Sequence, residues 1–350
     1  MSLPETTTQW IVRRAEGSSG LEKQEAPIPQ LGHNDVLIKV HAISLNYHDV
    51  GTIAGHYESL PNVVPVSDGS GVVLAVGSDI KDFQPGDRVT TVMNGAHQSG
   101  PIKPHYVNLL LGNALNGVLQ QYLVVPEQYI IPLPRNLSFI QGSTLPVAGL
   151  TAWDALYGAQ GRPLLQGQWI RTQGTGGVST FAMLFAKAAG AKVIATTSSV
   201  EKADRLKKIG ADHVINYNEV QNWGEQAKSL TPDGEGVDIV VEIGGGATLK
   251  QSLNAVKMDG LTSVVGLRAG ANPAEQPALL DMFFHFCTMR IARVGSRVQF
   301  GDMNRAIEVN DIKPVIDDRV FGLEEAREAF TYLESMRHFG KVCIEVVKDA

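Results

Sequence analysis

The stretch WIRTQGTGGVSTFAMLFAKAAGAKVIATTS, residues 169–198, sets the architecture expected for the chain around it. Residues 169–173 alternate in the manner of a buried strand, and the glycines of Gly174-Thr175-Gly176-Gly177 end that strand in a tight turn. Apolar residues then recur at helical spacing until Gly190 ends the helix, and residues 192–196 are typical of a second strand. The sequence therefore predicts a strand, a glycine turn, a helix and a strand, in that order.

The glycine turn is suited to an anionic ligand. Gly174 and Gly176 let the backbone approach a pyrophosphate closely, and the N–H groups of Gly177 and Val178 lie at the positive end of the helix dipole. A dinucleotide is the expected ligand, although Ser179 stands where the pattern G-x-G-x-x-G has its third glycine. A glycine-rich turn that binds nothing is the alternative.

The end of the second strand indicates which dinucleotide is bound. A site that prefers NAD places Asp or Glu there, and such a carboxylate would repel a 2′-phosphate. This chain has Thr197 and Ser198 at the strand end, and Lys202 follows in the next turn. Because hydroxyl donors and an ammonium group suit a phosphate dianion, we expect NADPH rather than NADH. For Lys202 alone, a solvated helix face is an equally good explanation.

The composition limits the class of protein. A chain of 350 residues with 43% hydrophobic and 19% charged residues is long enough for two domains with full cores. A net charge of -6, with no cluster of Lys or Arg, argues against nucleic acid or an anionic membrane as a partner. The N-terminal residues MSLPETTTQW carry no targeting pattern and no apolar run is long enough to span a membrane, so the cytoplasm is expected. Cys287 and Cys343, the only cysteines, cannot build a disulfide framework or a cysteine zinc site.

The first part of the chain predicts a small β-barrel. Short apolar strands alternate with glycine and proline turns, and they are expected at 9–14, 36–45, 69–78 and 87–92. Residues 93–118 lose this rhythm and predict a long functional loop or lid, after which strands return at 121–134.

From about residue 138 the pattern changes to alternating strands and helices. Residues 137–157 are helical in pattern on both sides of Pro146, and further strands are expected at 237–246 and 261–267. Parallel strands joined by helical crossovers explain this order. The last fifty residues, with a helix at 323–335 and a strand at 341–347, are expected to return to the first domain.

The chain contains a set of specific motifs: VLIKVHAISLNYHDV, PVSDGSGVVLAVGSDIKDFQPGDRV, LNGVLQQYLVVPEQYIIPLPRNLSF, TLPVAGLTAWDAL, QGTGGVS and GADHVINY. Together they resemble the medium-chain dehydrogenase/reductase superfamily, and within it the zinc-independent branch of NADPH quinone reductase-like and enoyl reductase-like proteins. The resemblance implies an α/β fold with a GroES-like β-barrel domain, residues 1–134 and 297–350, for the substrate. It also implies a Rossmann domain with a doubly wound parallel sheet, residues 135–296, and a cleft for the nicotinamide.

The positions that bind catalytic zinc in the zinc alcohol dehydrogenases of this superfamily have changed here. They correspond to Asn46, to Ser67 with Asp68 beside it, and to Val147 or Ala148, none of which supplies a thiolate or an imidazole. The four cysteines of the structural zinc are absent from the loop at 93–118 as well.

Only His48, Asp49 and His56 remain as candidates for a metal site, and scattered residues of this kind are far more often ordinary polar groups. We therefore expect no metal and a reaction without a Lewis acid. An enone, an enoyl group or a quinone suits such a reaction, because the charge left by hydride addition spreads into an enolate.

The resemblance also names catalytic candidates. Asn46 is expected beside the nicotinamide, where it binds the coenzyme or the substrate, with an ordinary turn residue as the alternative. Tyr57, in AGHYESLP, matches a tyrosine at the cleft mouth of quinone reductases and either donates to the enolate or packs on a planar substrate. His48 stands in place of the Ser or Thr proton relay of the zinc enzymes and is a second candidate donor. Solvent is the third.

The coenzyme contacts implied by the resemblance are spread over the chain: Asn46, Thr151, Gly174, Gly176, Gly177, Val178, Thr197, Ser198, Lys202, Tyr217, Gly244, Gly266 and Lys341. The segment LLDMFFHFC, residues 279–287, is a candidate substrate wall, although an aromatic stripe is more often core or dimer contact. A homodimer paired through an edge of the Rossmann sheet is implied too.

Three functions remain open from the sequence. The first is an NADPH-dependent reductase of activated C=C bonds or quinones. The second is a zinc-independent carbonyl reductase or alcohol dehydrogenase, which would reduce C=O instead. The third is an NADPH-binding protein with little catalytic activity.

Overall fold

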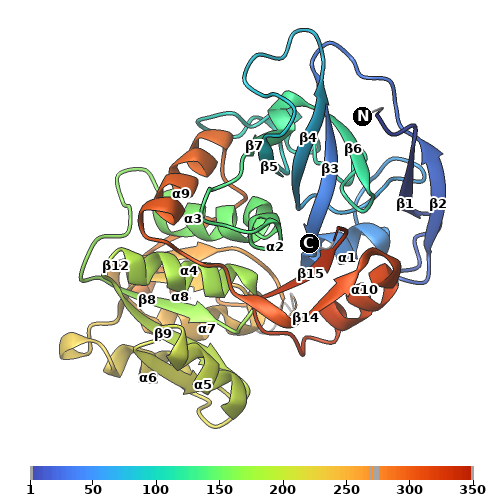
Figure 1. Cartoon of the computed structure of the whole chain (residues 1–350). Coiled ribbons are helices and arrows are strands. Elements are labelled where there is room, and N and C mark those ends of the chain that lie inside the picture. Colours follow the sequence, from blue (N-terminus) through green and yellow to red (C-terminus); the bar gives the residue numbers. More distant parts are fainter. Residues whose placement is uncertain (1–2, 269, 271–275, 348–350) are drawn as a thin grey trace. The chain divides into compact units, whose positions relative to one another are not determined.

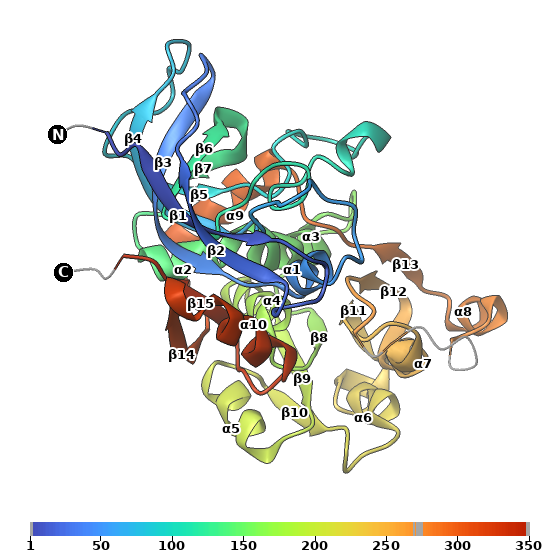
Figure 2. The same cartoon turned by 90° about the vertical axis from the view of Figure 1, so that its right-hand side faces the viewer.

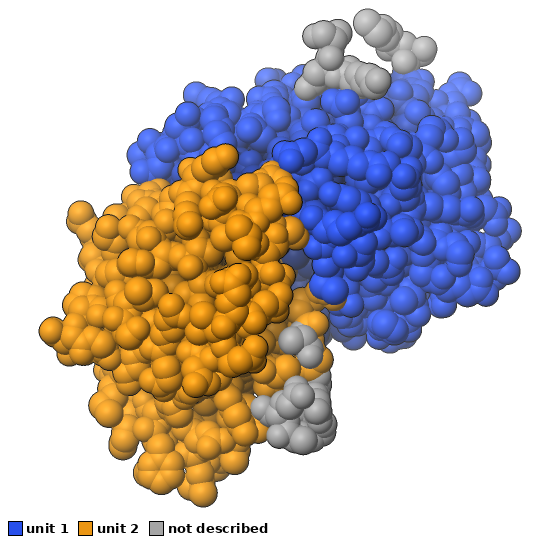
Figure 3. Space-filling view, turned by 90° about the horizontal axis from the view of Figure 1, so that it is seen from below, with its two compact units in different colours: residues 1–150, 296–350 blue, residues 151–295 orange. Residues whose placement is uncertain are grey.

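The computed structural model describes residues 3–268, 270 and 276–347 (Figure 1). The chain forms two compact units, which Figure 3 colours separately. Unit 1 comprises residues 1–150 and 296–350, and unit 2 comprises residues 151–295. Within the described residues no helix combines the length and the apolar character that crossing a bilayer requires.

Unit 2 is built on a six-stranded sheet in the order β10-β9-β8-β11-β12-β13, and every neighbouring pair is parallel. In β9 every residue after Lys192 is buried, as expected for a parallel strand covered on both faces. The strands are β8 (Trp169–Gln173), β9 (Lys192–Thr197), β10 (His213–Asn216), β11 (Val237–Glu242), β12 (Val256–Val264) and β13 (Thr288–Ile291).

The strand order of this sheet reverses between β8 and β11, since β9 and β10 lie on one side and β12 and β13 on the other. Ligands of doubly wound sheets bind beyond the carboxyl ends of the strands at such a reversal. The helices of unit 2 are α3 (Leu150–Tyr157), α4 (Gly177–Ala188), α5 (Val200–Lys208), α6 (Trp223–Ser229), α7 (Gly246–Ala255) and α8 (Leu279–His285). The predicted order of strand, glycine turn, helix and strand is thus confirmed, with Gly190 at φ 75° after α4.

Unit 1 contains a mostly antiparallel seven-stranded sheet in the order β14-β15-β3-β4-β5-β7, with β6 paired to β3, and a separate hairpin of β1 and β2. Its strands are β1 (Thr6–Val12), β2 (Leu21–Pro27), β3 (Asp35–Ser44), β4 (Gly69–Val76), β5 (Arg88–Thr91), β6 (Tyr122–Pro126), β7 (Ile130–Pro132), β14 (Ile316–Gly322) and β15 (Lys341–Glu345). Its helices are α1 (Tyr47–Ile53), α2 (Phe139–Ser143), α9 (Arg297–Val309) and α10 (Ala326–Glu334).

The pairing of β15 with β3 joins the two ends of the chain. Cys343 lies opposite Ser44 in the antiparallel register, and Leu45 donates its N–H to the carbonyl of Val342 at 2.9 Å. β3 is the centre of the unit because it also pairs with β4 and β6, and its apolar side chains enter the core. This pairing sets the start of β15 beside the turn that follows β3.

The boundary between the units lies later in the chain than the expected position at residue 135. Residues 135–150 belong to unit 1, because α2 packs on β3 and β4. Ser70 Oγ donates to the carbonyl of Phe139 at 2.6 Å, and Thr90 Oγ1 donates to that of Gly142 at 3.0 Å. A π-helical turn at Leu145–Gly149 then joins α2 to α3, so the helical pattern on both sides of Pro146 is confirmed.

Residues 93–118 form the predicted long loop, with a 3-10 turn at Pro104–Tyr106 and one isolated β-bridge between Leu111 and Leu115. Hydrogen bonds connect residues of this loop to each other and to neighbouring segments of unit 1. Asn94 Nδ2 donates to the carbonyl of Tyr106 at 2.8 Å, and the N–H of Gly117 donates to Val64 at 2.6 Å.

The burial of β9 generates a direct test of the fold of unit 2. Val193 is fully buried in β9, whereas Val200, at the start of α5, is 67% exposed. We expect Val193→Ala to lower the free energy of unfolding by about 2 kcal/mol and Val200→Ala to change it by less than about 0.5 kcal/mol. Urea denaturation of both variants measures the difference. Equal losses would contradict the described burial.

Candidate functional site

The candidate residues fall into groups, and the first is the glycine turn between β8 and α4. Gly174 has φ 68°, which glycine adopts without strain, and α4 begins at Gly177 with no side-chain cap at its N-terminus. A Cβ atom added at Gly174 or Gly176 would meet nothing within 4 Å. The backbone here is open to a ligand, and uncapped N–H groups at the positive end of a helix suit a phosphate.

Ser179 is accommodated at the position of the usual third glycine. Its side chain is buried, and its Oγ donates to the carbonyl of Gln173 at 2.5 Å. The hydroxyl therefore ties the first turn of α4 to the end of β8, where the usual glycine serves close packing of helix and strand. The glycine turn keeps its shape with serine at this position.

The second group lies at the end of β9. Thr197 is buried and accepts the N–H of Tyr217 on its carbonyl at 3.0 Å, so Tyr217 at the end of β10 stands beside it. Ser198 is exposed, and the next residue, Ser199, caps α5 by accepting the N–H of Lys202 at 3.3 Å. The three predicted residues Ser198, Lys202 and Tyr217 thus share one edge of unit 2, with no carboxylate at the strand end.

Gly244 and Gly266 lie on the loops after β11 and β12, at the same edge of the parallel sheet. The N–H of Arg268 donates to the carbonyl of Ile243 at 3.0 Å, so these two loops are joined. Thr151 is buried in α3 rather than at a strand end. Its expected coenzyme contact stays a prediction.

A buried charged cluster forms the third group, in unit 1. Lys341 Nζ donates to Asn46 Oδ1 at 2.5 Å and to the carbonyl of Leu45 at 2.7 Å, and only 3% of Lys341 is exposed. Because an ammonium group only donates, it fixes the Asn46 amide with Oδ1 toward Lys341. Lys341 was predicted to contact the coenzyme, and in the structure its ammonium group orients the side chain of Asn46.

Two buried carboxyl groups balance this ammonium. Asp68 accepts from Ser67 Oγ at 2.7 Å and from the N–H of Val147 at 3.2 Å, and Asp49 accepts the N–H of Asn46 at 2.7 Å. Burial raises the pKa of Asp49 to about 7, with the charge of Asp68 acting in the same direction. Burial also raises the pKa of Asp68 and lowers that of Lys341, while each charge opposes the shift of the other.

The Asn46 side chain stands close enough to both carboxyl groups to lower their pKa values. Its Nδ2 atom is buried, however, and within the described residues it has no acceptor in hydrogen-bonding geometry. The Nδ2 group of Asn46 is therefore a hydrogen-bond donor without a well-aligned acceptor among the described residues.

The residues at the three positions matched to zinc ligands do not fit a zinc ion. The first position supplies the amide oxygen of Asn46, which already accepts from Lys341. The second supplies the buried Ser67 and Asp68 pair, and the third supplies only the apolar side chains at 147 and 148. Across residues 3–268, 270 and 276–347 no three His, Cys, Asp or Glu side chains gather in a way that could hold a metal ion. An ammonium group between carboxylates also opposes a second cation by charge repulsion.

The fourth group surrounds Tyr57. The ring of His48 stacks on the ring of Tyr57 with centroids 4.4 Å apart and an angle of 21° between the planes. Tyr57 is 47% exposed, and a Cβ at Gly51 would lie 2.4 Å from its ring, so glycine in α1 makes room for it. The structure brings these two catalytic candidates together, with Tyr57 on the solvent side.

A chain of hydrogen bonds fixes the tautomer of His48. Thr52 Oγ1 donates to the carbonyl of His48 at 3.3 Å and accepts from Asn113 Nδ2 at 3.0 Å. Asn113 Oδ1 therefore faces His48 Nε2 at 3.1 Å, so Nε2 must carry the hydrogen. Burial lowers the pKa of His48 despite this bond, which leaves the ring neutral at pH 7 with its hydrogen donated to Asn113. His48 is thus a weaker candidate for proton donor than Tyr57.

Several of these residues gave no signal in the sequence. Asn113 lies in the long loop, 65 residues from His48, and contacts this residue of α1 only because the folded chain brings them together. Asp49 and Asp68 stood in the motifs, but nothing in their spacing indicated that both would be buried beside Lys341. Gln173 and Glu242, at the ends of β8 and β11, also interact strongly. A Gln directly before the glycine turn was the one hint available.

A doubly wound parallel sheet with the glycine turn at its carboxyl edge is a Rossmann domain. Residues 32–135 match the alcohol dehydrogenase GroES-like domain, and residues 177–309 match the zinc-binding dehydrogenase family. The chain belongs to the medium-chain dehydrogenase/reductase superfamily and is an oxidoreductase of that superfamily.

Similar proteins cover nearly the whole chain. A zinc-type alcohol dehydrogenase-like protein of Schizosaccharomyces pombe is 38% identical over 336 residues, 94% of this chain and 96% of the relative. A chloroplastic NADPH-dependent alkenal/one oxidoreductase of Arabidopsis thaliana is 28% identical over 352 residues, 98% of this chain and 80% of the relative. A crystal structure of an NAD-dependent alcohol dehydrogenase matches with a TM-score of 0.87 at 30% identity, over 97% of this chain and 100% of the other. The expected family and fold class are thereby confirmed.

The environment of His48 gives a prediction for its titration. In Asn113→Asp a carboxylate would face Nε2, and we expect the pKa of His48 to rise by roughly 1–3 units because the charged imidazolium gains an opposite charge. Asn116→Asp adds the same charge to the loop at an exposed residue whose Oδ1 accepts from Val64, so it should leave His48 nearly unchanged. NMR titration of the histidines measures both. A similar shift in the two variants would contradict the assigned contact.

Proposed function

We propose that this chain is an NADPH-dependent reductase that transfers hydride to an activated C=C bond, such as an enone or enoyl group, or to a quinone, without zinc. The observation that carries the proposal is a buried cluster in which Lys341 lies beside Asn46 and the Ser67 and Asp68 pair, which the family resemblance matches to positions of zinc ligands. An ammonium held by protein oxygens has no vacant coordination position. The acceptor must therefore spread its own developing charge, as an enone or a quinone does.

The coenzyme preference rests on the end of β9. Exposed Ser198 and half-buried Lys202 suit a 2′-phosphate, and the strand end lacks the carboxylate that an NAD site uses. The open glycine turn suits the pyrophosphate common to both coenzymes. The names of the relatives point both ways, since one is NADPH-dependent and another NAD-dependent. We infer NADPH from the residues of this chain.

In this proposal the bound coenzyme supplies a hydride, and the chain orients the substrate and supplies the proton. The buried Nδ2 group of Asn46, whose Oδ1 is held by Lys341, is in this proposal the donor to the nicotinamide or the substrate oxygen. Tyr57, on the solvent side of neutral His48, donates to the enolate oxygen, and His48 supports its ring by stacking.

A second candidate is a zinc-independent carbonyl reductase or alcohol dehydrogenase. The alcohol dehydrogenase names of two similar proteins favour it. Hydride addition to a simple ketone leaves the negative charge on one oxygen atom. Asn46 and Tyr57 would therefore have to stabilise more localised charge than in the reduction of an enone.

We also propose a cytoplasmic homodimer that takes a small-molecule substrate. The exposed apolar side chains at one edge of unit 2 support pairing through that edge: Leu279, Leu280, Phe283, Phe284 and Ile291 are each at least 62% exposed. They lie on α8 and on β13, the outer strand of the sheet (Figure 2). This assigns residues 279–287 to subunit contact rather than to a substrate wall.

The reaction itself is tested by product analysis. With NADPH and an enone we expect the saturated ketone, because the acceptor carbon is the β-carbon of the C=C bond. NMR of the product distinguishes it from the allylic alcohol, which would favour the second candidate. The rate should survive a chelator. Stoichiometric zinc in an active, chelator-sensitive preparation would overturn the proposal.

The phosphate role of Lys202 is tested by reversing its charge. Lys202→Glu should raise the Kd of NADPH by about tenfold or more and change that of NADH by less than about threefold, because only NADPH carries the 2′-phosphate. Lys207→Glu is the matched control, since it makes the same charge change in the last turn of α5, where Lys207 pairs with Asp204. Equal weakening of both coenzymes by Lys202→Glu would count against the assignment.

A further inference from the structure

The last residues of β8 and β11 bind each other across the point where the strand order reverses. Gln173 Nε2 donates to Glu242 Oε2 at 2.7 Å. Gln173 Oε1 accepts the backbone N–H groups of Ile243 at 2.5 Å and Gly244 at 2.9 Å. Since Oε1 is occupied by two donors, the amide has one orientation, with Nε2 toward Glu242.

Glu242 holds the loop that leads from β11 into α7. The side chain is fully buried, and its Oε1 accepts the N–H of Gly245 at 2.8 Å and the hydroxyl of Thr248 at 2.5 Å. Its Oε2 also accepts from Ser252 Oγ. Through Gln173 this carboxylate is joined to the end of β8, so one buried group fixes both loops.

Arg171 supplies the opposite charge beneath this pair. It is fully buried in β8, donates from Nη1 to Ser252 Oγ at 2.8 Å, and lies 3.8 Å from the ring centre of Trp223. Its Nε and Nη2 atoms have no hydrogen-bond partner in the described part of the chain. Burial lowers the pKa of Arg171 to about 9, and the charge of Glu242 opposes this shift. The two groups form a charge-balanced pair in the core of unit 2.

The loops that this pair fixes are the ones that carry candidate coenzyme residues. Gly174 follows Gln173 directly, and Gly244 lies two residues after Glu242. A Cβ at Gly244 would lie 2.2 Å from Thr248 Oγ1, so glycine is needed at this point of the loop while Thr248 keeps its bond to Glu242. We propose that Gln173 and Glu242 form a latch that sets the two glycine loops at the spacing a dinucleotide requires, and that both are positioning residues for coenzyme binding. This inference rests on the dinucleotide binding of the proposed function.

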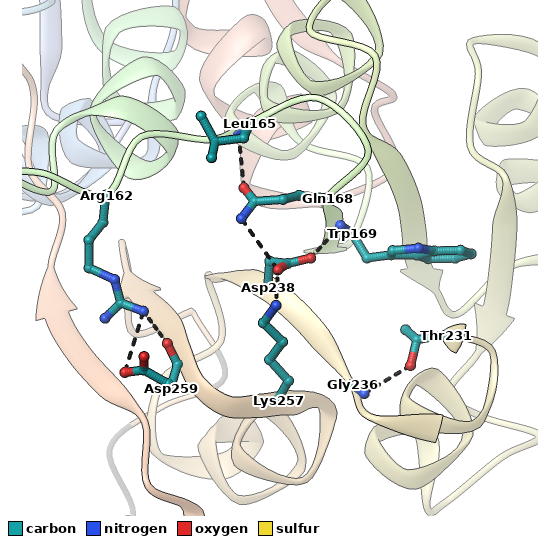
Figure 4. A network of polar contacts seen from close by, with 9 residues as sticks. All are labelled: Arg162, Leu165, Gln168, Trp169, Thr231, Gly236, Asp238, Lys257 and Asp259. Carbon is teal, nitrogen blue, oxygen red and sulfur yellow. Dashed lines mark hydrogen bonds and ion pairs between the residues drawn. The ribbon is translucent and has the colours of Figure 1, made fainter. Parts of the chain in front are cut away.

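The opposite ends of the same two strands provide a matched control (Figure 4). Gln168, just before β8, donates from Nε2 to Asp238 Oδ1 at 3.3 Å, and its Oε1 accepts the N–H of Leu165 at 2.8 Å. Asp238 also accepts the N–H of Trp169 at 2.7 Å and pairs with Lys257. This pair repeats the chemistry of Gln173 and Glu242 at the edge of the sheet that carries no candidate coenzyme residue.

The experiment compares Gln173→Leu with Gln168→Leu in the full chain. Both variants lose a partly buried glutamine that links β8 to β11, and both should unfold at a lower temperature. We expect Gln173→Leu to raise the Kd of NADPH and of NADH by a similar factor, about tenfold or more, and Gln168→Leu to leave both within about twofold. Titration by coenzyme fluorescence measures the Kd values of the folded proteins.

The outcomes separate the latch from the proposed function. If the wild type binds neither coenzyme, the proposed function and the latch both fall. If the wild type binds and Gln173→Leu binds as tightly, or if both variants weaken binding equally, only the latch is overturned.

An exchange of the two groups provides a second test and covers a Gln173→Leu that does not fold. Gln173→Glu sets two carboxylates against each other at this contact, and Glu242→Gln replaces the amide–carboxylate bond by a contact between two amides. Each single variant should therefore raise the Kd of both coenzymes. The double variant Gln173→Glu/Glu242→Gln restores one donor amide and one carboxylate, and it should recover most of the loss. No recovery in a folded double variant would contradict the latch.

Discussion

An ionised side chain buried without an opposite charge destabilises a protein by several kcal/mol, and this constraint organises both units of the chain. In unit 1 the buried ammonium of Lys341 is balanced by Asp68 and Asp49. In unit 2 the buried guanidinium of Arg171 is balanced by Glu242. Each cluster is hydrogen-bonded to a candidate ligand residue or to the loop that carries one: Lys341 bonds Asn46, and Glu242 bonds Gln173 and Gly245. The groups that balance the charges therefore also fix the positions of these candidate residues.

The cluster of unit 1 depends on the pairing of the two chain ends. Lys341 begins β15 and Asn46 follows β3, and they meet because those strands are neighbours. Burial raises the pKa of Asp49 to about 7, which reduces the negative charge that its carboxyl contributes beside Lys341 at neutral pH. A cluster in which a buried ammonium is already paired with buried carboxyl groups has little affinity for a further cation, which agrees with the poor fit of this site to zinc.

The sequence predicted those parts of the fold that local patterns encode. The glycine turn, α4 and β9 follow from glycine chemistry and apolar spacing, and they appear where expected. β2 was not expected, because LEKQEAP has only one fully buried side chain and its charged residues face solvent. The boundary at residue 150 was also missed, because the packing of α2 on β3 and β4 involves residues far away in the sequence.

The candidate site was predictable to the same extent. Motifs indicated Asn46, His48 and Tyr57 one by one, but contacts across long stretches of chain decide what each can do. Asn113 lies 65 residues from His48 and sets its tautomer, and Glu242 lies 69 residues from Gln173. Periodicity and spacing carry no information on such pairs, since burial and opposite charge select them only after folding.

The chemistry expected of this site follows from what an ammonium cluster can and cannot supply. Zinc in a catalytic site stabilises a developing oxyanion by direct coordination, whereas Lys341 has already given hydrogen bonds to Leu45 and Asn46. In the proposed reaction the substrate therefore meets a neutral donor, the Asn46 amide or the Tyr57 hydroxyl, and a neutral donor stabilises less charge than a metal ion does. A substrate that delocalises its own charge compensates for this difference, so the acceptor class proposed for this chain follows from the identity of the buried cation.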